Sequence, residues 1–166
     1  MAAVPILPRI GGLMYNRILV PVEHSPYDEV ILAHVRKLAR TCNNASIVLI
    51  HVADGWAARS INELDLRESE EMKSDREYIE AIADSFEKEG FDVDAILAGG
   101  DPAKEIADCA KRENCDLIAM ATHGHRGLSD VIRGSVASEL RHITMVPVLM
   151  VRGGPGLSPP TPRPKV

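Results

Sequence analysis

The sequence predicts an α/β protein with a single domain, in which five parallel strands form one sheet covered by helices on both faces. Three observations lead to this fold class. Short apolar stretches alternate with longer amphipathic stretches, the apolar stretches lack a regular polar alternation, and the length of 166 residues suits one domain. Strands that are apolar throughout are typical of a parallel sheet buried on both faces, with right-handed crossovers.

The first half of the domain is expected to hold two strands and two helices. The apolar run 18–22 is the first strand, and the following Ser25, Pro26 and Asp28 supply an N-cap, a proline and an acid for a helix to about Cys42. The second strand covers 46–52, and after an irregular link over 53–66 a long helix runs to Glu89. The residues expected on the inner faces of the two helices are Val30, His34, Val35 and Leu38, and then Met72, Ile79, Ile82, Ala83 and Phe86.

The second half repeats the alternation. A strand over 91–98 turns Val93, Ala95 and Leu97 inward and is broken by Gly99-Gly100. Asp101 and Pro102 then cap a third helix, which runs to about Glu113. The remaining elements are a strand over 116–122, a helix over 136–143 opened by Gly134-Ser135, and a last strand over 146–151.

Composition excludes several classes of protein. A net charge of −5 and a pI near 5.7 argue against duplex nucleic acid as the main partner. No apolar run approaches the length of a membrane span, so no membrane insertion is expected. The three cysteines form no Cys-x-x-Cys pair, which indicates reduced thiols and a cytoplasmic location. Residues 1–13 are interpreted as a flexible extension without a signal peptide, and the proline-rich residues 153–166 as a disordered tail.

The spacing of glycines after the fourth strand indicates an anion site. The sequence Ala121-Thr122-His123-Gly124 is followed, after nine intervening residues, by Gly134-Ser135 at the expected start of a helix. Free N–H groups at a helix start attract phosphate. Ligands of such sheets bind beyond the carboxyl ends of the strands, where the strand order reverses. If the first and fourth strands are neighbours, Glu23 to Ser25 and residues 121–127 face one crevice.

Five separated segments, in this order, resemble the universal stress protein family over residues 15–152. They are Ile18 to Val22 followed by an acid and Ser25; Leu49 to Val52; Gly100-Asp101-Pro102; Asp116 to Met120; and Gly134-Ser135-Val136 followed by Pro147 to Val151. The resemblance implies one Rossmann-like (HUP-type) domain over 14–152. The pattern Gly-x2-Gly-x9-Gly-Ser is that of the family's ATP-binding branch, and this chain keeps its last three positions.

The resemblance also implies the roles of the site residues. Pro21, Val22 and Val52 would hold adenine, Glu23 and Ser25 would lie at the adenosine end, and Met120 and Ala121 near the ribose. The phosphates would meet His123, Gly124, Arg126, Gly127, Gly134, Ser135 and Val136. The expected ligand is ATP, or AMP or ADP, with or without Mg²⁺. Taken singly, most of these residues suit an ordinary core, turn or solvated surface equally well.

Two positions depart from the family pattern. Ala121 stands where the first glycine is usual, and its methyl group resists positive φ, so a weaker contact with the ribose is expected. Glu23 stands where the family usually carries Asp. Its longer side chain keeps the charge and displaces the carboxylate by about one methylene group, which requires different hydrogen bonds at the adenosine end.

Histidines near the glycines also suggest catalysis. Thr122-His123-Gly124-His125 is similar to the His-x-Gly-His pattern of nucleotidyltransferases, but there the histidines follow the first strand instead of the fourth. The chain lacks a P-loop, and no acid near these histidines in sequence completes a metal site. Dedicated catalysis is therefore not expected, and slow ATP hydrolysis is the most that this pattern supports.

The last strand, Val146 to Val151, would be an exposed apolar edge unless it were paired. The resemblance implies a homodimer joined through this strand, while coverage by the tail is the alternative. Three functions follow: an ATP-binding homodimeric regulator with an unknown protein partner, a slow ATPase or nucleotidyltransferase, and an interaction module with a vestigial nucleotide pocket.

Overall fold

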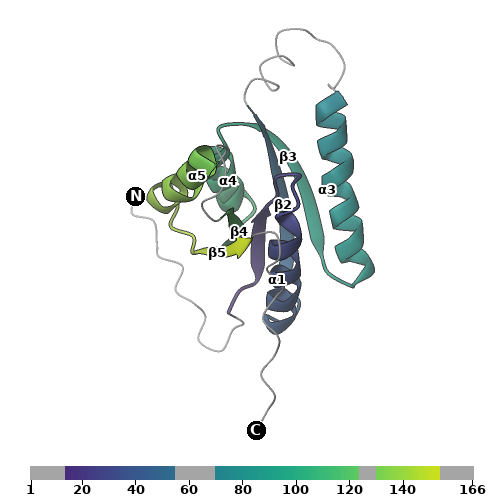
Figure 1. The fold of residues 1–166 in the computed structure, drawn as a ribbon. Helices are drawn as coiled ribbons and strands as arrows, with labels where there is room; N and C mark the ends of the chain where they lie inside the picture. Colours follow the sequence, from purple (N-terminus) through teal and green to yellow (C-terminus); the bar gives the residue numbers. More distant parts are fainter. Residues whose placement is uncertain (1–13, 55–69, 124–129, 154–166) are drawn as a thin grey trace.

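The computed structural model describes residues 14–54, 70–123 and 130–153 (Figure 1). Within these ranges five strands alternate with four helices. In chain order they are β1 (Arg17–Pro21), α1 (Asp28–Thr41), β2 (Ser46–Asp54), α3 (Glu70–Lys88), β3 (Val93–Gly100), α4 (Pro102–Arg112), β4 (Leu117–His123), α5 (Asp130–Ile143) and β5 (Val148–Gly153). The predicted extension 1–13, the predicted tail beyond Gly153 and the link over 55–66 lie outside the described residues.

The five strands form one parallel sheet in the order β3-β2-β1-β4-β5. This arrangement confirms the predicted fold class. It also confirms the assumption that the first and fourth strands are neighbours. The chain builds the sheet outward from β1 in one direction with β2 and β3, and in the other with β4 and β5, so the order reverses between β1 and β4.

Helices cover both faces of the sheet, with α1 and α3 on one side and α4 and α5 on the other (Figure 1). Alternate residues of each central strand enter the two cores. Ile18 and Val20 of β1 pack with α1 and α3, while Leu19 between them packs with α4 and α5, and all three are fully buried. Full burial of an aliphatic side chain contributes about 2 kcal/mol, which explains why these strands carry no polar alternation.

The two predicted N-caps have different outcomes. Asp101 caps α4 as predicted, because its side chain accepts a hydrogen bond from the N–H of Lys104 at 3.0 Å. The prediction for Ser25 was wrong: α1 begins at Asp28, and its N-cap residue is Tyr27, which makes no side-chain cap bond. Ser25 lies two residues earlier, and its own N–H donates to the Asp28 carboxylate.

The predicted inner face of the long helix is confirmed by the burial of Ile79, Ile82, Ala83 and Phe86. For α1 the prediction was wrong in part. Val35 is buried with Ile31 four residues earlier, but His34 is exposed because it lies about 100° around the helix from Val35. Ala95 of β3 is also exposed, since β3 is an edge strand with β2 as its neighbour in the sheet.

Several element boundaries were wrong, including the following three. Gly99 and Gly100 continue β3, because they pair with Ala53 and Asp54 of β2. β5 begins at Val148, two residues later than predicted. The helix α5 begins at Asp130, so Gly134 and Ser135 lie inside it instead of opening it. The sequence holds a signal for this earlier start, since Ser129-Asp130 is a typical N-cap and first-turn acid.

Candidate functional site

The crevice predicted by the sequence corresponds to a divergence of β1 and β4. These strands pair only through Ile18 with Leu117 and Leu19 with Ile118, near the start of each strand. By contrast, β1 pairs with β2 along its whole length, and β4 pairs with β5 from Ile118 to His123. The carboxyl ends of β1 and β4 therefore separate from each other at the point where the strand order reverses, which is where parallel sheets hold ligands.

The structure brings seven of the predicted site residues to the carboxyl ends of the three central strands. Pro21 ends β1, buried Val22 follows it, and the half-buried Glu23 and Ser25 lie in the loop that leads to α1. On either side of β1, the neighbouring strands contribute the other three, which are Val52 of β2 and Met120 and Ala121 of β4. Ala121 pairs with Val151 of β5.

The residues predicted to meet the phosphates are less completely described. Gly124, Arg126 and Gly127 lie outside the described residues, and for His123, Gly134 and Ser135 only the backbone is described. Val136 is half-buried and packs against the core beneath α4 and α5. Because α5 begins at Asp130, Val136 lies in its second turn, where backbone N–H groups normally bond within the helix. The phosphate roles of these residues stay predictions.

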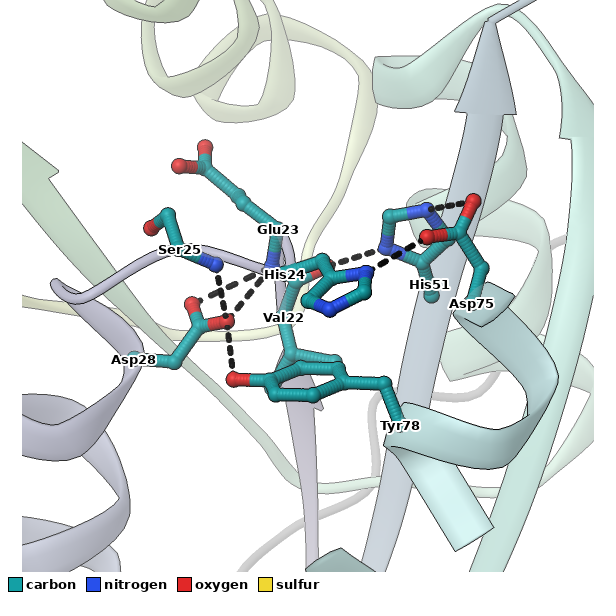
Figure 2. A network of polar contacts seen from close by, with 8 residues as sticks. All are labelled: Val22, Glu23, His24, Ser25, Asp28, His51, Asp75 and Tyr78. Carbon is teal, nitrogen blue, oxygen red and sulfur yellow. Dashed lines mark hydrogen bonds and ion pairs between the residues drawn. The ribbon is translucent and has the colours of Figure 1, made fainter. Parts of the chain in front are cut away.

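Asp28 organises the loop between β1 and α1 (Figure 2). Its carboxylate accepts hydrogen bonds from the backbone N–H groups of Glu23 and Ser25, each at 3.1 Å, and from the hydroxyl of Tyr78 at 2.9 Å. Asp28 is 2% exposed, so burial removes water from its carboxylate, and these three donors replace that water. Sequence reasoning identified Asp28 only as a first-turn acid.

A second acid, Asp75 of α3, joins two histidines. One carboxylate oxygen lies 2.8 Å from Nδ1 of His24 in the loop, and the other lies 3.2 Å from Nε2 of His51 in β2. The other ring nitrogen of His51, Nδ1, lies 2.9 Å from the carbonyl oxygen of Val22. His24 has a φ of 57°, a left-handed conformation that is costly for a residue with a side chain.

Tyr78 links Asp28 to His24, which in turn contacts Asp75. Its ring stacks on His24 with centroids 4.1 Å apart and planes 16° apart, while its hydroxyl donates to Asp28. Burial, reinforced by the negative charge of Asp28, raises the pKa of the Tyr78 hydroxyl well above its ordinary value. The hydroxyl therefore stays a hydrogen-bond donor throughout the neutral range.

The network Asp28, His51, Asp75 and Tyr78 was missed by sequence reasoning. Asp75 and Tyr78 are three residues apart on α3, one turn before the buried Ile79 and Ile82, so they extend its inner face. A polar residue on an apolar helix face is a usable signal for a buried partner, and Asp75 supplied it. His51 was grouped only with the apolar second strand.

The Glu23 side chain extends away from Asp28, while its backbone N–H points toward that carboxylate (Figure 2). Asp28 thus holds the loop through main-chain N–H groups. Across the described residues 14–54, 70–123 and 130–153, no group of three or more acids, histidines or cysteines has the arrangement of a metal site. In the same ranges, no helix is both long and apolar enough to cross a membrane.

The sequence and the fold of this chain are similar to those of known proteins. The model of the universal stress protein family matches residues 14–152. Universal stress protein MJ0577 of Methanocaldococcus jannaschii is 32% identical over 161 residues, covering 85% of this chain and 97% of the relative. The solved structure of MJ0577 superposes with a TM-score of 0.71 at 31% identity, covering 86% of this chain and 99% of that one.

More distant structures share the fold. A universal stress protein from Archaeoglobus fulgidus, solved in complex with dAMP, is 20% identical with a TM-score of 0.60, covering 83% of this chain and 98% of that one. Another universal stress protein, solved in complex with cAMP, is 16% identical with a TM-score of 0.59, covering 83% and 97%. The family match, the relative above 30% identity and the five-stranded parallel sheet agree: this chain belongs to the universal stress protein family.

Proposed function

We propose that this protein binds an adenine nucleotide between the carboxyl ends of β1 and β4. The observation that carries the proposal is the divergence of these two strands at the reversal of strand order, beside a loop whose backbone is held by Asp28. Two proteins of the same fold bind dAMP and cAMP, which supports an adenine nucleotide as the ligand.

In this proposal the adenosine end of the ligand lies against the described residues. Val22 is 3% exposed and Met120 is 6% exposed, so the chain beside the site is apolar at both strands, which suits a base and a ribose. Ser25 supports the same assignment, because its Oγ is buried and has no hydrogen-bond partner among the described residues. A buried hydroxyl without a partner is costly, and a ligand would supply one.

The proposal assigns the phosphates to the glycine pattern. Gly124, Gly134 and Ser135 keep the spacing of the nucleotide-binding branch, and Arg126 and His123 follow β4 closely in sequence. The ligand is ATP, AMP or ADP, with Mg²⁺ as a companion of the phosphates if ATP is bound. If nucleotide binding is weaker than in relatives with a glycine at this position, we expect the lost contact at Ala121, beside the ribose, rather than at the phosphates.

We further propose that the protein is a cytoplasmic homodimer in which nucleotide binding regulates assembly or a protein partner, without dedicated turnover. β5 is an edge of the sheet, and exposed apolar side chains lie on and before it. Met145 is fully exposed, Ile143 is 46% exposed and Met150 is 44% exposed. Pairing of β5 with a second copy would cover this apolar edge.

The direct test is to denature freshly purified protein and identify any released small molecule by mass spectrometry. Stripped protein is then titrated with ATP, ADP and AMP in a calorimeter, together with Gly134→Glu and Ser135→Asp. Both substitutions add bulk and negative charge at the proposed phosphate position, so binding is expected to be lost. Ser74→Asp, on the exposed side of α3, is the matched control and should bind normally.

Absence of binding by stripped wild-type protein to all three nucleotides would overturn the proposal. Binding accompanied by steady release of phosphate, abolished by His123→Ala, would favour the enzyme instead. Dimerisation and partner binding that ignore nucleotide would favour the interaction module. Size-exclusion chromatography with light scattering, with and without nucleotide, separates the last case from a nucleotide-dependent regulator.

A further inference from the structure

Besides α1, two elements hold the loop after β1, and they contact it at different points. β2 provides His51, which contacts the carbonyl oxygen of Val22. α3 provides Asp75, which contacts the side chain of His24. α3 also provides Tyr78, which stacks on His24 and bonds to Asp28 (Figure 2). The loop conformation that carries Glu23 and Ser25 therefore depends on how α3 and β2 are joined.

The contacts of His51 require a specific number of protons. The carbonyl oxygen of Val22 only accepts hydrogen bonds, so Nδ1 of His51 must carry a proton. A neutral imidazole then has a lone pair at Nε2, and this atom lies 3.2 Å from a carboxylate oxygen of Asp75. Two lone pairs at this distance repel each other, so one further proton is needed between His51 and Asp75.

The second oxygen of Asp75 adds no proton to this gap. It lies 2.8 Å from Nδ1 of His24, which meets the carboxylate as a donor. His51 is 9% exposed and Asp75 is 8% exposed, so water does not replace a lost contact easily. Imidazole is a stronger base than a carboxylate, which places the shared proton on His51 and makes the contact an ion pair.

We propose that His51 and Asp75 are positioning residues of the nucleotide site, and that they hold the loop after β1 through one shared proton. Raising the pH removes this proton, turns the contact between His51 and Asp75 from attractive to repulsive, and loosens the loop. Nucleotide affinity therefore falls when a rise in pH removes this proton. This inference rests on the proposed nucleotide site and adds its regulation by pH.

Several charged or titratable groups face His51 or its partners. The acidic groups that face it or its partners are Asp75 on α3 and Asp28 on α1, with Tyr78 as a neutral phenol between them. His24 is the other basic group in the network, and it meets the same carboxylate. On β3, the residue paired with His51 is the uncharged Leu97. The described residues thus bring two acids, Asp28 and Asp75, to His51 and its partners.

Asp75→Asn provides a discriminating variant. An asparagine in the same position accepts from His24 through its oxygen and donates to Nε2 of a neutral His51 through its amide. All contacts of the network are then satisfied without the extra proton. A residue with a merely structural role would lose affinity or stability at every pH on this substitution, whereas the proposal predicts that the pH dependence itself disappears.

The experiment measures the affinity of stripped protein for AMP between about pH 6 and about pH 8.5. Wild type is expected to bind about fivefold more weakly at the upper end, the equivalent of one net hydrogen bond. Asp75→Asn is expected to show no such loss. Because the phosphate of AMP titrates in every sample, its contribution cancels between variants. Asp84→Asn on the exposed side of α3 and His34→Gln on α1 are the controls, and both should follow wild type.

A second readout does not need a nucleotide. In wild-type protein labelled with ¹⁵N-histidine, nuclear magnetic resonance should show protons on both ring nitrogens of His51 near about pH 6, with one lost on raising the pH. In Asp75→Asn the ring should be neutral with its proton on Nδ1 throughout. If Asp75→Asn does not fold, the wild-type spectra and wild-type pH profile test the proposal alone.

The outcomes separate the two proposals. Equal slopes for wild type and Asp75→Asn, or a flat wild-type profile, would overturn the shared-proton role while leaving nucleotide binding intact. A singly protonated His51 at every pH would overturn it as well. If no variant binds AMP at any pH, the nucleotide site is wrong, and the spectra still decide the proton state of His51.

Discussion

At the loop after β1, the buried acids Asp28 of α1 and Asp75 of α3 meet donors from within the chain, whereas apolar side chains on and before β5 stay exposed. The loop belongs to a central strand, and its contacts come from α1, β2 and α3. β5 has β4 as its neighbour in the sheet. This difference supports the two proposals, which are a small-molecule site beside the held loop and a protein interface at the uncovered apolar edge.

The largest effect on stability is expected at Asp28, whose carboxylate holds the loop after β1. Asp28→Ala removes the acceptor of two backbone N–H groups and of the Tyr78 hydroxyl. Loss of these bonds should lower the free energy of unfolding by about 3 kcal/mol and the melting temperature by roughly 6 to 12 °C. Calorimetry or urea unfolding measures both. Asp84→Ala, an exposed acid on α3, should change stability by less than about 0.5 kcal/mol.

The next largest effect is expected on dimer formation, from a substitution on the edge strand β5. Met150→Glu places a charge on the exposed face of β5, so the proposed dimer should weaken by at least about 30-fold, the equivalent of about 2 kcal/mol. Light scattering over a dilution series measures the dissociation constant. The matched control is Met14→Glu, since Met14 is 77% exposed and precedes β1. A dimer unchanged by Met150→Glu would show that copies of the chain associate elsewhere.

A smaller effect on stability is expected from removing the Tyr78 hydroxyl. Tyr78→Phe keeps the ring on His24 and removes only the bond to Asp28, so stability at neutral pH should fall by about 1 kcal/mol. Because burial beside Asp28 raises the pKa of Tyr78, this contribution is present below about pH 10 and is lost as the pH rises further. Urea unfolding of both proteins across the alkaline range checks this: a difference that persists unchanged far above pH ~10 would contradict it.

The smallest effect concerns the apolar core beneath α4. Burial raises the pKa of Cys115 to about 12 and raises that of Cys109 as well. Few thiolates form at neutral pH, so a thiol reagent should label neither cysteine in folded protein. Labelling followed by mass spectrometry measures this, with urea-unfolded protein as the positive control. Rapid labelling of the folded protein would show that this face opens readily.

The sequence predicted the succession of elements and most of the strand cores, because hydrophobic periodicity is a local signal. It predicted element ends less well. The glycines at 99–100 suggested an end to β3, yet backbone pairing with β2 continues through them. The start of α5 was assigned to the glycine pattern, although Ser129 and Asp130 already provide a helix start one turn earlier.

For the candidate site, sequence reasoning found the apolar residues at the strand ends and the loop after β1. It did not find the contacts that hold this loop. Asp75 is 51 residues from His24 and Tyr78 is 50 residues from Asp28, so no local pattern connects them. A buried acid on the inner face of a helix indicates that a partner exists, but the identity of the partner depends on how the helix packs.

The sequence by itself determined the fold class and the family, and it predicted where a site would lie, since each depends on short segments and their order along the chain. Only the tertiary structure decided that β1 and β4 are neighbours that diverge, and that α3 and β2 hold the loop between them through His24, His51, Asp75 and Tyr78. The physical reason is that periodicity fixes which face of an element is buried, while strand order and side-chain pairing arise from contacts between residues far apart in the chain.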